Sequence, residues 1–448
     1  MRLLLVFLFF SFYWPIAAQQ QAGWKSLFNG QDLSGWKQLN GNARYEARDG
    51  MIVGTTVMNE PNSFLATDRE YQDFVLELEF MADSTMNSGI QFRSESRPDY
   101  LNGRVHGYQM EIDPSDRAWS GGIYDEGRRL WLYTLEYNPA AKTAYKRKGW
   151  NKYRIECDGN TVRTWVNGVP AAFLVDDMDT RGFIALQVHS IAKPEDAGRQ
   201  IRWRNIRIRE GKPSNPAPDI FIVNLLHNKL TPEEGRQGVQ LLWDGHSTNG
   251  WRGAYKTAFP EKGWSINDGV LSITPSGGAE SAFGGDIVTE KMFSAFELQF
   301  EFRLSEGANS GVKYFVTEKE GNTGSAIGLE YQVLDDVKHP DAQQGAAGNR
   351  TLGSLYDLIP SLKFGQASRK IGEWNRGMIR VHRDGRIEHF LNGYKVVEYN
   401  RNTQMFTALV ARSKYAQWKD FGMAKEGRIL IQDHGDRVDY RSIKIRAL

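Results

Sequence analysis

The chain repeats itself, and this duplication constrains its fold more than any other feature. The segment GWKSLFNGQDLSGWK at residues 23–37 returns in altered form as GVQLLWDGHSTNGW at residues 238–251. Further pairs follow in the same order: YEARDGMIVG (45–54) with WSINDGVLSI (264–273), Asn87-Ser88-Gly89 with Asn309-Ser310-Gly311, Tyr108-Gln109 with Tyr331-Gln332, Asn167-Gly168 with Asn392-Gly393, and LQVH (186–189) with IQDH (431–434). A chain of 448 residues is too long for one compact core, so the repeat predicts two tandem domains.

The boundary between the copies is marked by composition. Residues 211–219, GKPSNPAPD, are rich in Pro, Ser and Gly, which is typical of a linker. The next stretch contains Thr231-Pro232-Glu233-Glu234, a typical helix start. We therefore predict a first domain at 23–210, a linker and partly helical segment at 211–237, and a second domain at 238–448.

The hydrophobic pattern within each copy has a period of two. In residues 296–304, Phe and Leu alternate with Glu, Gln and Arg, as expected for a strand with one face in the core. Asp-Gly pairs at 49–50 and 268–269 predict tight turns between such strands. Many short strands in about 200 residues predict an all-β fold of two antiparallel sandwiches or jelly rolls. One sheet of such a sandwich can form a concave polar face for a glycan.

The first residues have the form of a signal peptide. Arg2 is followed by the apolar run Leu3 to Ile16, and Ala17-Ala18 offers a cleavage site, so residues 1–18 are the predicted signal. The run is too short for a confident membrane span, and no comparable run follows. Cys157 is the only cysteine, so no intrachain disulfide forms. We expect a periplasmic or secreted protein without a membrane span.

Composition narrows the function classes. The formal net charge is +2, which gives no strong field for nucleic acid or an anionic membrane. Aromatic residues make up 12% of the chain, including 13 Trp, and aromatic platforms are common where sugars bind. Most of these rings are expected in the cores instead. The expected partner is a carbohydrate.

The candidate site lies on one face of the strand GLEYQVLDD, residues 328–336. Glu330 and Gln332 point to one side of it, and Lys313 follows the NSG motif in an earlier strand. Gln432 and His434 share a face near the chain end. A cation, a carboxylate and an imidazole on adjoining strands can perform acid–base chemistry. The alternatives are a structural histidine and a solvated sheet face.

Two loops are placed to border this face. The polar insert at residues 337–352 carries His339, and the segment ARSKYAQWKDFG carries Lys414 and Trp418. Asp335, Asp336 and His339 could bind a divalent cation, but their spacing fits no specific motif, so no metal site is predicted and the cofactor stays unknown. A mobile surface loop is the alternative for the insert.

Several of these motifs together resemble the 3-keto-disaccharide hydrolase family, also described as 3-keto-glucoside 1,2-lyase/3-keto-2-hydroxy-glucal hydratase. They are GWKSLFNGQDLSGWK, NSGIQFR, EYQVLDD with HPDA, GSLYDLIP, EWN, FLNGYKVVEY, LIQDHGD and YRSIKIR. The resemblance covers both halves and is strongest in the second. The first half has MEIDP for QVLDD, QVHS for QDHG and no HPDA loop, which favours a different specificity or no activity there.

The resemblance implies a concanavalin-like jelly roll and an exported enzyme that cleaves 3-keto-glycosides. A base removes the C2 proton, the C1–O bond breaks, and water adds, for net hydrolysis. From the strand faces and the recurrence we expect a particular set of residues to carry this chemistry. The catalytic candidates are Glu330, His434, Lys313 and Tyr356; the substrate-binding candidates are Gln332, Asp335, His339, Lys414, Trp418 and Gln432, with Arg93, Gln109, Glu111 and His189 in the first half and Tyr124 as the analogue of Tyr356.

Two other functions fit the same sequence. A lectin-like carbohydrate-binding protein needs amides and aromatic rings but no acid–base pair, and one catalytic domain could be joined to one binding domain. The paired acidic and imidazole groups favour the enzyme.

Overall fold

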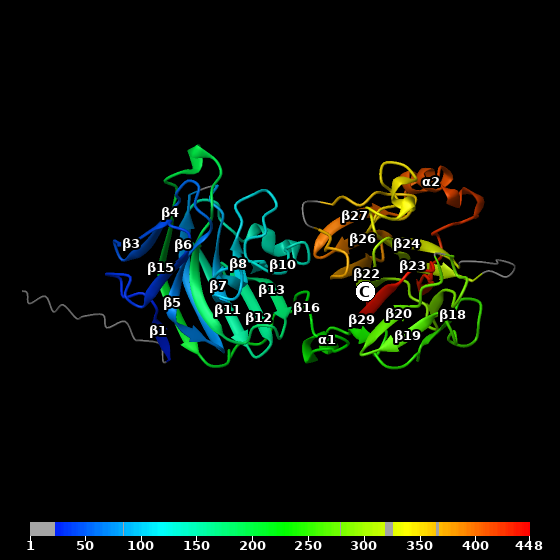
Figure 1. The fold of residues 1–448 in the computed structure, drawn as a ribbon, viewed down its shortest axis with the longest axis horizontal. Helices are drawn as coiled ribbons and strands as arrows, with labels where there is room; N and C mark the ends of the chain where they lie inside the picture. The colour runs from blue at the N-terminus through cyan, green and yellow to red at the C-terminus, as the bar shows by residue number, and fades with distance from the viewer. Residues whose placement is uncertain (1–22, 84, 278, 319–325, 364–366) are drawn as a thin grey trace, which may run out of the picture.

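The computed structural model describes residues 23–83, 85–277, 279–318, 326–363 and 367–448. The chain forms two β-sandwiches that lie next to each other (Figure 1). The predicted all-β, jelly-roll class is confirmed, and tandem copies of one domain account for the chain. The predicted signal peptide lies outside the described residues.

The first sandwich is built from residues on both sides of the predicted linker. Its larger sheet has the order β16 (Val223–Asn224), β13 (Val169–Val175), β12 (Thr161–Val166), β11 (Asn151–Asp158), β6 (Phe74–Ala82), β15 (Gln200–Glu210), β4 (Met51–Thr55) and β3 (Arg44–Arg48), with β1 (Trp24–Ser26) on β15. Its second sheet has the order β10 (Leu130–Tyr133), β9 (Ile123–Glu126), β8 (His106–Ile112), β7 (Ser88–Glu95), β14 (Gly182–Val188), β5 (Ser63–Tyr71) and β2 (Trp36–Asn40). Short 3-10 turns are η1 (Pro139–Thr143) and η2 (Pro194–Asp196).

The second sandwich repeats this arrangement. Its larger sheet has the order β19 (Trp264–Asn267), β20 (Val270–Ile273), β29 (Val438–Ala447), β22 (Phe296–Leu304), β25 (Trp374–Val381), β26 (Arg386–Leu391) and β27 (Tyr394–Asn400), with β17 (Gln240–Leu241) on β29. Its smaller sheet has the order β18 (Trp251–Gly253), β21 (Ile287–Thr289), β28 (Arg428–Ile431), β23 (Asn309–Thr317) and β24 (Ile327–Leu334). The remaining elements are α1 (Pro232–Arg236), η3 (Pro340–Gln343), α2 (Gln404–Ala411) and η4 (Lys414–Gln417).

The repeated turn motifs adopt the same backbone geometry in both copies. Asp49 and Gly50 have φ of 52° and 71°, and Asp268 and Gly269 have φ of 50° and 72°. Positive φ at both central residues is the signature of the hairpin turns that join twisted strands tightly. Local chemistry therefore fixes these hairpins in each domain.

Alternation along the strands fills the space between the sheets. In β22, Phe296, Leu298, Phe300 and Phe302 are buried in the core of the second domain. Burial of each such side chain contributes about 1.5–3 kcal/mol relative to exposure. Cys157 is buried in the core of the first domain, where burial raises the pKa of its thiol to about 12, so it is not a reactive thiol.

The two sandwiches contact each other where Trp119, β10 and the loop after β10 meet β25 and the β26–β27 hairpin. Phe390 belongs to the buried cluster of the first domain, where its ring stacks on Tyr137 with centroids 5.8 Å apart. Trp119 and Tyr394 make an edge contact at 5.1 Å. The Arg376 guanidinium donates to the carbonyl oxygen of Leu132 at 2.9 Å. Apolar packing and hydrogen bonds thus both join the domains.

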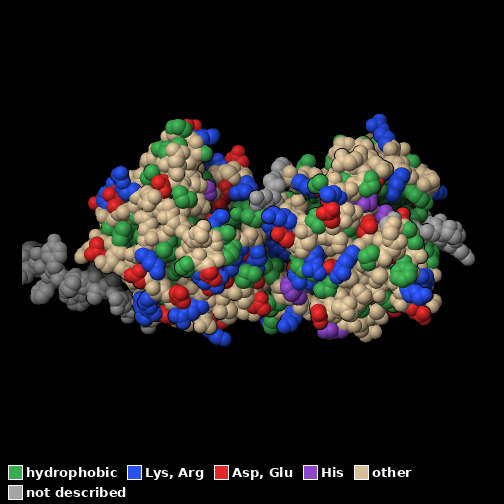
Figure 2. All heavy atoms as spheres, viewed as in Figure 1, with side chains coloured by type: hydrophobic (Ala, Val, Ile, Leu, Met, Phe, Trp, Pro, Cys, Tyr) green, Lys and Arg blue, Asp and Glu red, His purple; other side chains and the backbone are tan. Residues whose placement is uncertain are grey.

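The surface carries charges of both signs. On the face shown in Figure 2, Lys and Arg side chains are interspersed with Asp and Glu over both domains. Within the described ranges, no helix has the length and apolar character needed to cross a membrane.

Candidate functional site

The site is built on three neighbouring strands of the smaller sheet of the second domain, β28, β23 and β24. Lys313 in the central strand β23 lies opposite Glu330 of β24 and Leu430 of β28. Both charged side chains are almost enclosed, with exposed fractions of 6% for Lys313 and 4% for Glu330. The structure therefore brings together the cation and the carboxylate that the sequence predicted on adjoining strands.

A glycine makes room for the carboxylate. A Cβ atom on Gly311 would lie 2.9 Å from Cδ of Glu330 and closer still to Oε1, which real side chains do not tolerate. The carboxyl group of Glu330 therefore lies across the bare backbone of β23. The NSG motif positions the acid through this absent side chain. The Ser310 hydroxyl of the same motif donates to the carbonyl oxygen of Gln432 at 2.7 Å and so joins β23 to the end of β28.

The electrostatics of Lys313 and Glu330 are coupled. Burial raises the pKa of the Glu330 carboxyl, while the positive charges of Lys313, Lys414 and His434 partly oppose this rise. Burial alone would lower the pKa of Lys313, but the carboxylates of Glu330, Asp286 and Glu280 outweigh it and raise that pKa. Lys313 therefore remains a cation at neutral pH, beside a carboxyl group whose pKa lies above its usual range.

Gln332 orients the acid. In the orientation that satisfies its hydrogen-bonding groups, its amide nitrogen donates to Glu330 Oε1 and to the carbonyl oxygen of Ser310, both at 3.1 Å. The amide thereby fixes one carboxylate oxygen and leaves the sheet face polar. Gln432, on the other side of β23, donates from Nε2 to Glu280 Oε1 at 3.1 Å.

Tyr356 is held above β24 by the insert that the sequence predicted to border the site. Its backbone N–H donates to the carbonyl oxygen of Glu330 at 3.0 Å, and its hydroxyl donates to Asp341 Oδ2 at 2.7 Å. Burial and the neighbouring carboxylates raise the pKa of its phenol. The Lys414 ammonium lies 4.3 Å from the centre of the Tyr356 ring, a cation–π contact. Both side chains therefore join the site of Glu330.

The two histidines of the prediction also meet. The rings of His339 and His434 are nearly perpendicular, with centroids 5.9 Å apart. Burial and the adjacent His434 lower the pKa of His339, which favours its neutral form. The positive form of His434 in turn lowers the pKa of Glu330, which places this pair at the edge of the same site.

Two predicted contacts have other partners. Asp335 accepts hydrogen bonds from the backbone N–H groups of Gly307 at 2.8 Å, Val337 at 3.0 Å and Lys338 at 3.2 Å, so it fixes the start of the insert. Trp418 lines a cavity of about 480 Å³ with Phe315, Ile327 and Phe421, and neither Lys313 nor Glu330 lines that cavity.

Two acidic residues were missed by the sequence analysis. Asp286 is buried beside Lys313, and its Oδ1 accepts from the Asp433 N–H at 2.9 Å. The negative charge of Glu280 raises the pKa of both Lys313 and Glu330. Both residues follow the Gly-rich segment PSGG, which shows no strand periodicity. The sequence therefore indicated only that two acidic residues lie near a glycine-rich loop, and not that they reach the site.

The strand register of the first domain corrects the pairing expected from the sequence. Gln91 lies opposite Gln109 in the place of Lys313 and Glu330, and Glu111 takes the place of Gln332. The expected pairing of Tyr108-Gln109 with Tyr331-Gln332 was thus out of register by two residues. The Gln91 amide donates to Gln109 Oε1 at 2.7 Å, so two neutral amides stand where the second domain has a cation and a carboxyl group.

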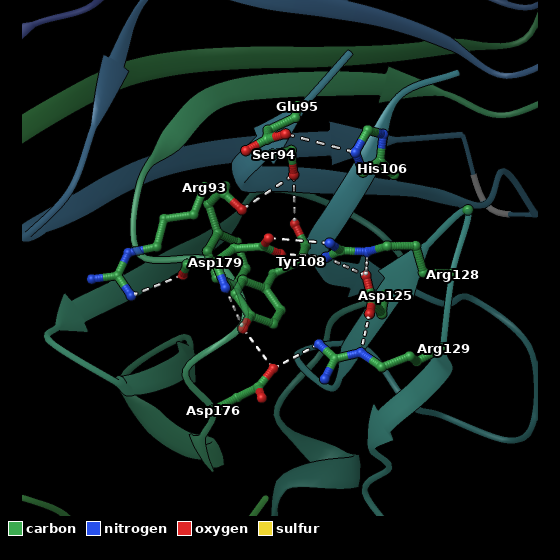
Figure 3. A network of polar contacts seen from close by, with 12 residues as sticks. Arg93, Ser94, Glu95, His106, Tyr108, Asp125, Arg128, Arg129, Asp176 and Asp179 are labelled. Atoms are coloured by element: carbon green, nitrogen blue, oxygen red, sulfur yellow. Dashed lines mark hydrogen bonds and ion pairs between the residues drawn. The ribbon is translucent and has the colours of Figure 1, made fainter. Parts of the chain in front are cut away.

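Arg93 does not join this face, contrary to its predicted role as a substrate-binding residue of the first half. A bulge after Phe92, where Arg93 has φ of 46°, puts Ser94 next to Gln91 instead, and the Ser94 hydroxyl donates to Gln91 Oε1 at 2.7 Å. The buried Arg93 guanidinium donates to Asp73 Oδ1 at 3.1 Å. Figure 3 shows Arg93 within the network formed by Tyr108, Asp125, Arg128, Arg129, Asp176 and Asp179.

Glu111 is a buried acid that makes no salt bridge with any of the described residues. Burial raises the pKa of Glu111 to about 7, although the side-chain amides of Asn87 and Gln109 each donate to it at 2.8 Å. Tyr124 pairs with Gln109 across β8 and β9, as Tyr356 does with Glu330. His189 lies with Nδ1 2.7 Å from the carbonyl oxygen of Ser190. The first domain therefore keeps the amides, the acid and the tyrosine but not the lysine.

Fold and site together define a duplicated β-sandwich protein with an acid–base pair on one sheet of its second domain. The family model of the 3-keto-alpha-glucoside-1,2-lyase-like domain matches residues 23–209 and again residues 238–446. The chain belongs to this family and contains two copies of its domain.

Individual relatives are similar to parts of the chain. A 3-keto-disaccharide hydrolase from Bacteroides thetaiotaomicron is 38% identical over 232 residues, which cover 47% of this chain and 79% of that protein. A crystal structure of a candidate glycosyl hydrolase from Parabacteroides distasonis is 28% identical, with a TM-score of 0.43, and covers 50% of this chain and all of its own. A carbohydrate-binding module from Bacillus subtilis is 14% identical, with a TM-score of 0.30, and covers 39% of this chain and 96% of its own.

Proposed function

We propose that this protein is an exported enzyme whose second domain cleaves 3-keto-glycosides by removal of the C2 proton and elimination of the C1 substituent. Membership of the family and the similarity to a 3-keto-disaccharide hydrolase support the substrate class. The single observation that supports the mechanism is the placement of the enclosed Lys313 and Glu330 opposite each other on adjacent strands.

In the proposed first step Glu330 acts as the base. A raised pKa makes its carboxylate a stronger base than an exposed one, and Gln332 holds it in place. Glu330 takes the C2 proton, and the electron pair of the C–H bond forms an enolate with the C3 carbonyl. The Lys313 ammonium stabilises the negative oxygen, which is the type of electrostatic support that preorganised charges supply.

In the second step the enolate collapses. The C3 carbonyl re-forms, a C1=C2 double bond forms, and the C1–O bond breaks. The leaving oxygen receives a proton from His434 or from the Tyr356 hydroxyl, which both border the Glu330 carboxyl. Addition of water to C1, with a proton returned to C2, completes the net hydrolysis.

The first domain is proposed to bind sugar without cleaving it. Its Gln91–Gln109 pair offers amide donors and acceptors for hydroxyl groups but carries no charge for an enolate. The proposal thus assigns catalysis to the second domain and keeps the lectin-like function for the first.

Solvent exchange tests the proposed chemistry. In D2O the purified protein should place deuterium at C2 of a 3-keto-glucoside, and Glu330→Gln should reduce this exchange by about 10²–10⁴-fold, the usual contribution of a general base. Glu426→Gln, at an exposed carboxylate, is the matched control and should retain full exchange. Sugar binding without exchange or product by the wild-type protein would favour the lectin-like function.

Export is tested separately. In a producing bacterium we expect the mature protein in the periplasm or medium, with its N-terminus at Gln19. Full-length protein that retains Met1 in the cytoplasm would contradict this proposal.

A further inference from the structure

Three side chains of metal-binding type, two imidazoles and one carboxylate, meet beside the proposed base. One nitrogen from each ring of His339 and His434 and one carboxylate oxygen of Asp436 lie within 4.8 Å of one another. His339 precedes η3 in the insert, while His434 and Asp436 follow β28. Throughout the part of the chain that the structure describes, no other group of three or more His, Cys, Asp or Glu residues meets this criterion. All three side chains are partly exposed, so a ligand could reach them from solvent.

From this geometry we propose that His339, His434 and Asp436 bind a divalent transition-metal ion. Two imidazoles and one carboxylate suit Mn²⁺, Fe²⁺, Co²⁺ or Zn²⁺. Three protein ligands that leave coordination positions open are typical of catalytic metal sites rather than structural ones. Ligand bonds of about 2.1 Å require the donor atoms to move closer together, and all three residues lie in loops rather than within strands.

The surroundings of the three residues indicate how each is held. Asp436 Oδ2 accepts from the backbone N–H of Asn309 at 3.1 Å, which orients its carboxylate. Nδ1 of His434 is buried and has no hydrogen-bond partner among the described residues. A buried polar atom without a partner is costly to leave unsatisfied, which is consistent with a water or an ion at that position.

His339 must rearrange to coordinate through Nε2. Its Nδ1 accepts from the Asp341 N–H at 3.2 Å, so the neutral ring carries its proton on Nε2. Coordination at Nε2 moves that proton to Nδ1 and breaks this hydrogen bond. The metal–nitrogen bond formed at Nε2 replaces this hydrogen bond.

The site belongs to the second domain alone. His189 occupies the place of His434 in the first domain, but Ile191 stands where Asp436 stands in the second, and the HPDA insert is missing. The two differences coincide with the loss of the Lys–Glu pair in the first domain. The domain that has all three proposed ligands is thus the domain that has both Lys313 and Glu330, which associates the proposed metal site with the proposed catalytic residues.

The role of the metal rests on the proposed function. A 3-keto sugar presents a carbonyl oxygen at C3 and a hydroxyl at the neighbouring C2, which form a chelating pair. A cation there would act as a Lewis acid, acidify the C2 proton and stabilise the enolate oxygen together with Lys313. His434 would then serve as a ligand, which leaves Tyr356 as the proton donor to the leaving group.

Metal binding can be measured without any substrate. After dialysis against EDTA, the wild-type protein should take up one Mn²⁺ per chain, seen as loss of the EPR signal of free Mn²⁺. His434→Ala and Asp436→Asn should weaken this binding at least tenfold, whereas His246→Ala, at an exposed loop, should leave it unchanged. Thermal unfolding of each variant verifies that the fold is intact.

Binding and catalysis give separate outcomes. Failure of the wild-type protein to bind Mn²⁺, Co²⁺ or Zn²⁺ below about 1 mM, or equal binding by the His434 and Asp436 variants, would overturn the site. Metal binding with C2 exchange that is equally fast in EDTA would retain the site and overturn its catalytic role. Absence of C2 exchange in the metal-loaded protein would count against the proposed function alone.

Discussion

Gly311 offers the sharpest test of how the fold positions Glu330, the proposed base. Gly311→Ala adds a methyl group that would lie 2.9 Å from Cδ of Glu330 and nearer to Oε1, so the carboxyl group must move by about 1 Å. A displacement of that size can cost about 10²-fold in rate. Overpacking of an enclosed site destabilises proteins by about 1–3 kcal/mol.

The first domain supplies a matched control at the equivalent strand position. In Gly89→Ala the new Cβ would lie 2.5 Å from Cγ of Gln109, so the steric conflict is similar. Both variants should lose similar free energy of unfolding, but only Gly311→Ala should lose kcat. Steady-state kinetics on a 3-keto-disaccharide and urea unfolding measure the two effects. Equal losses of kcat, or a larger loss in Gly89→Ala, would refute the assignment of catalysis to the second domain.

Three further predictions concern charge and capping. Because Lys414 lowers the pKa of Glu330, Lys414→Met should move the acidic limb of the kcat/KM profile to higher pH; a profile reduced in height but unmoved would contradict this. The pKa of Glu111 is raised to about 7, so its contribution to stability is full below the pKa of the unfolded chain and is lost as pH rises through 7. Relative to Glu111→Gln, the free energy of unfolding of the wild-type protein, measured by urea titration, should therefore fall by up to about 3 kcal/mol between pH 4 and pH 8. A difference in unfolding free energy between the two proteins that does not change with pH would exclude this explanation. Thr231 and Glu234 form a capping box at α1, so Thr231→Ala should lower the free energy of unfolding by about 1 kcal/mol, and an unchanged urea midpoint would show that the cap is not needed.

Features of short range were predictable from the sequence. The Asp-Gly turns depend on residues that tolerate positive φ, and the same dihedrals occur in both copies. The shared face of Glu330 and Gln332 follows from the two-residue period of a strand, and the structure places both side chains beside Lys313. Duplication then extended these local patterns to the second copy.

Features that depend on register or on irregular backbone were not predictable. The bulge beside Arg93 inserts one residue, so its side chain leaves the face that alternation assigned to it. Pairing the copies by the Tyr-Gln dipeptide misplaced the counterparts of Glu330 and Gln332, because only hydrogen-bonded register distinguishes a two-residue shift. Glu280 reaches the site from a segment without periodicity.

The loop acids show a related limit. Asp335 was predicted to bind the substrate because it follows the site strand. In the structure its carboxylate accepts hydrogen bonds from three backbone N–H groups around the start of the insert. Asp336 pairs with Lys363 and accepts from the Leu352 N–H at 2.7 Å. Carboxylates that cap loops and carboxylates that bind cations are alike in sequence, and only the positions of their partners separate them.

The central claim is that Glu330, held across Gly311 and supported by Lys313, removes the C2 proton of an oxidised sugar. The most direct measurement is the rate of deuterium incorporation at C2 of a 3-keto-glucoside in D2O, followed by NMR for the wild-type protein and Glu330→Gln. The account predicts exchange by the wild-type protein and a loss of about 10²-fold or more in a folded variant. Exchange at the wild-type rate by folded Glu330→Gln would contradict it.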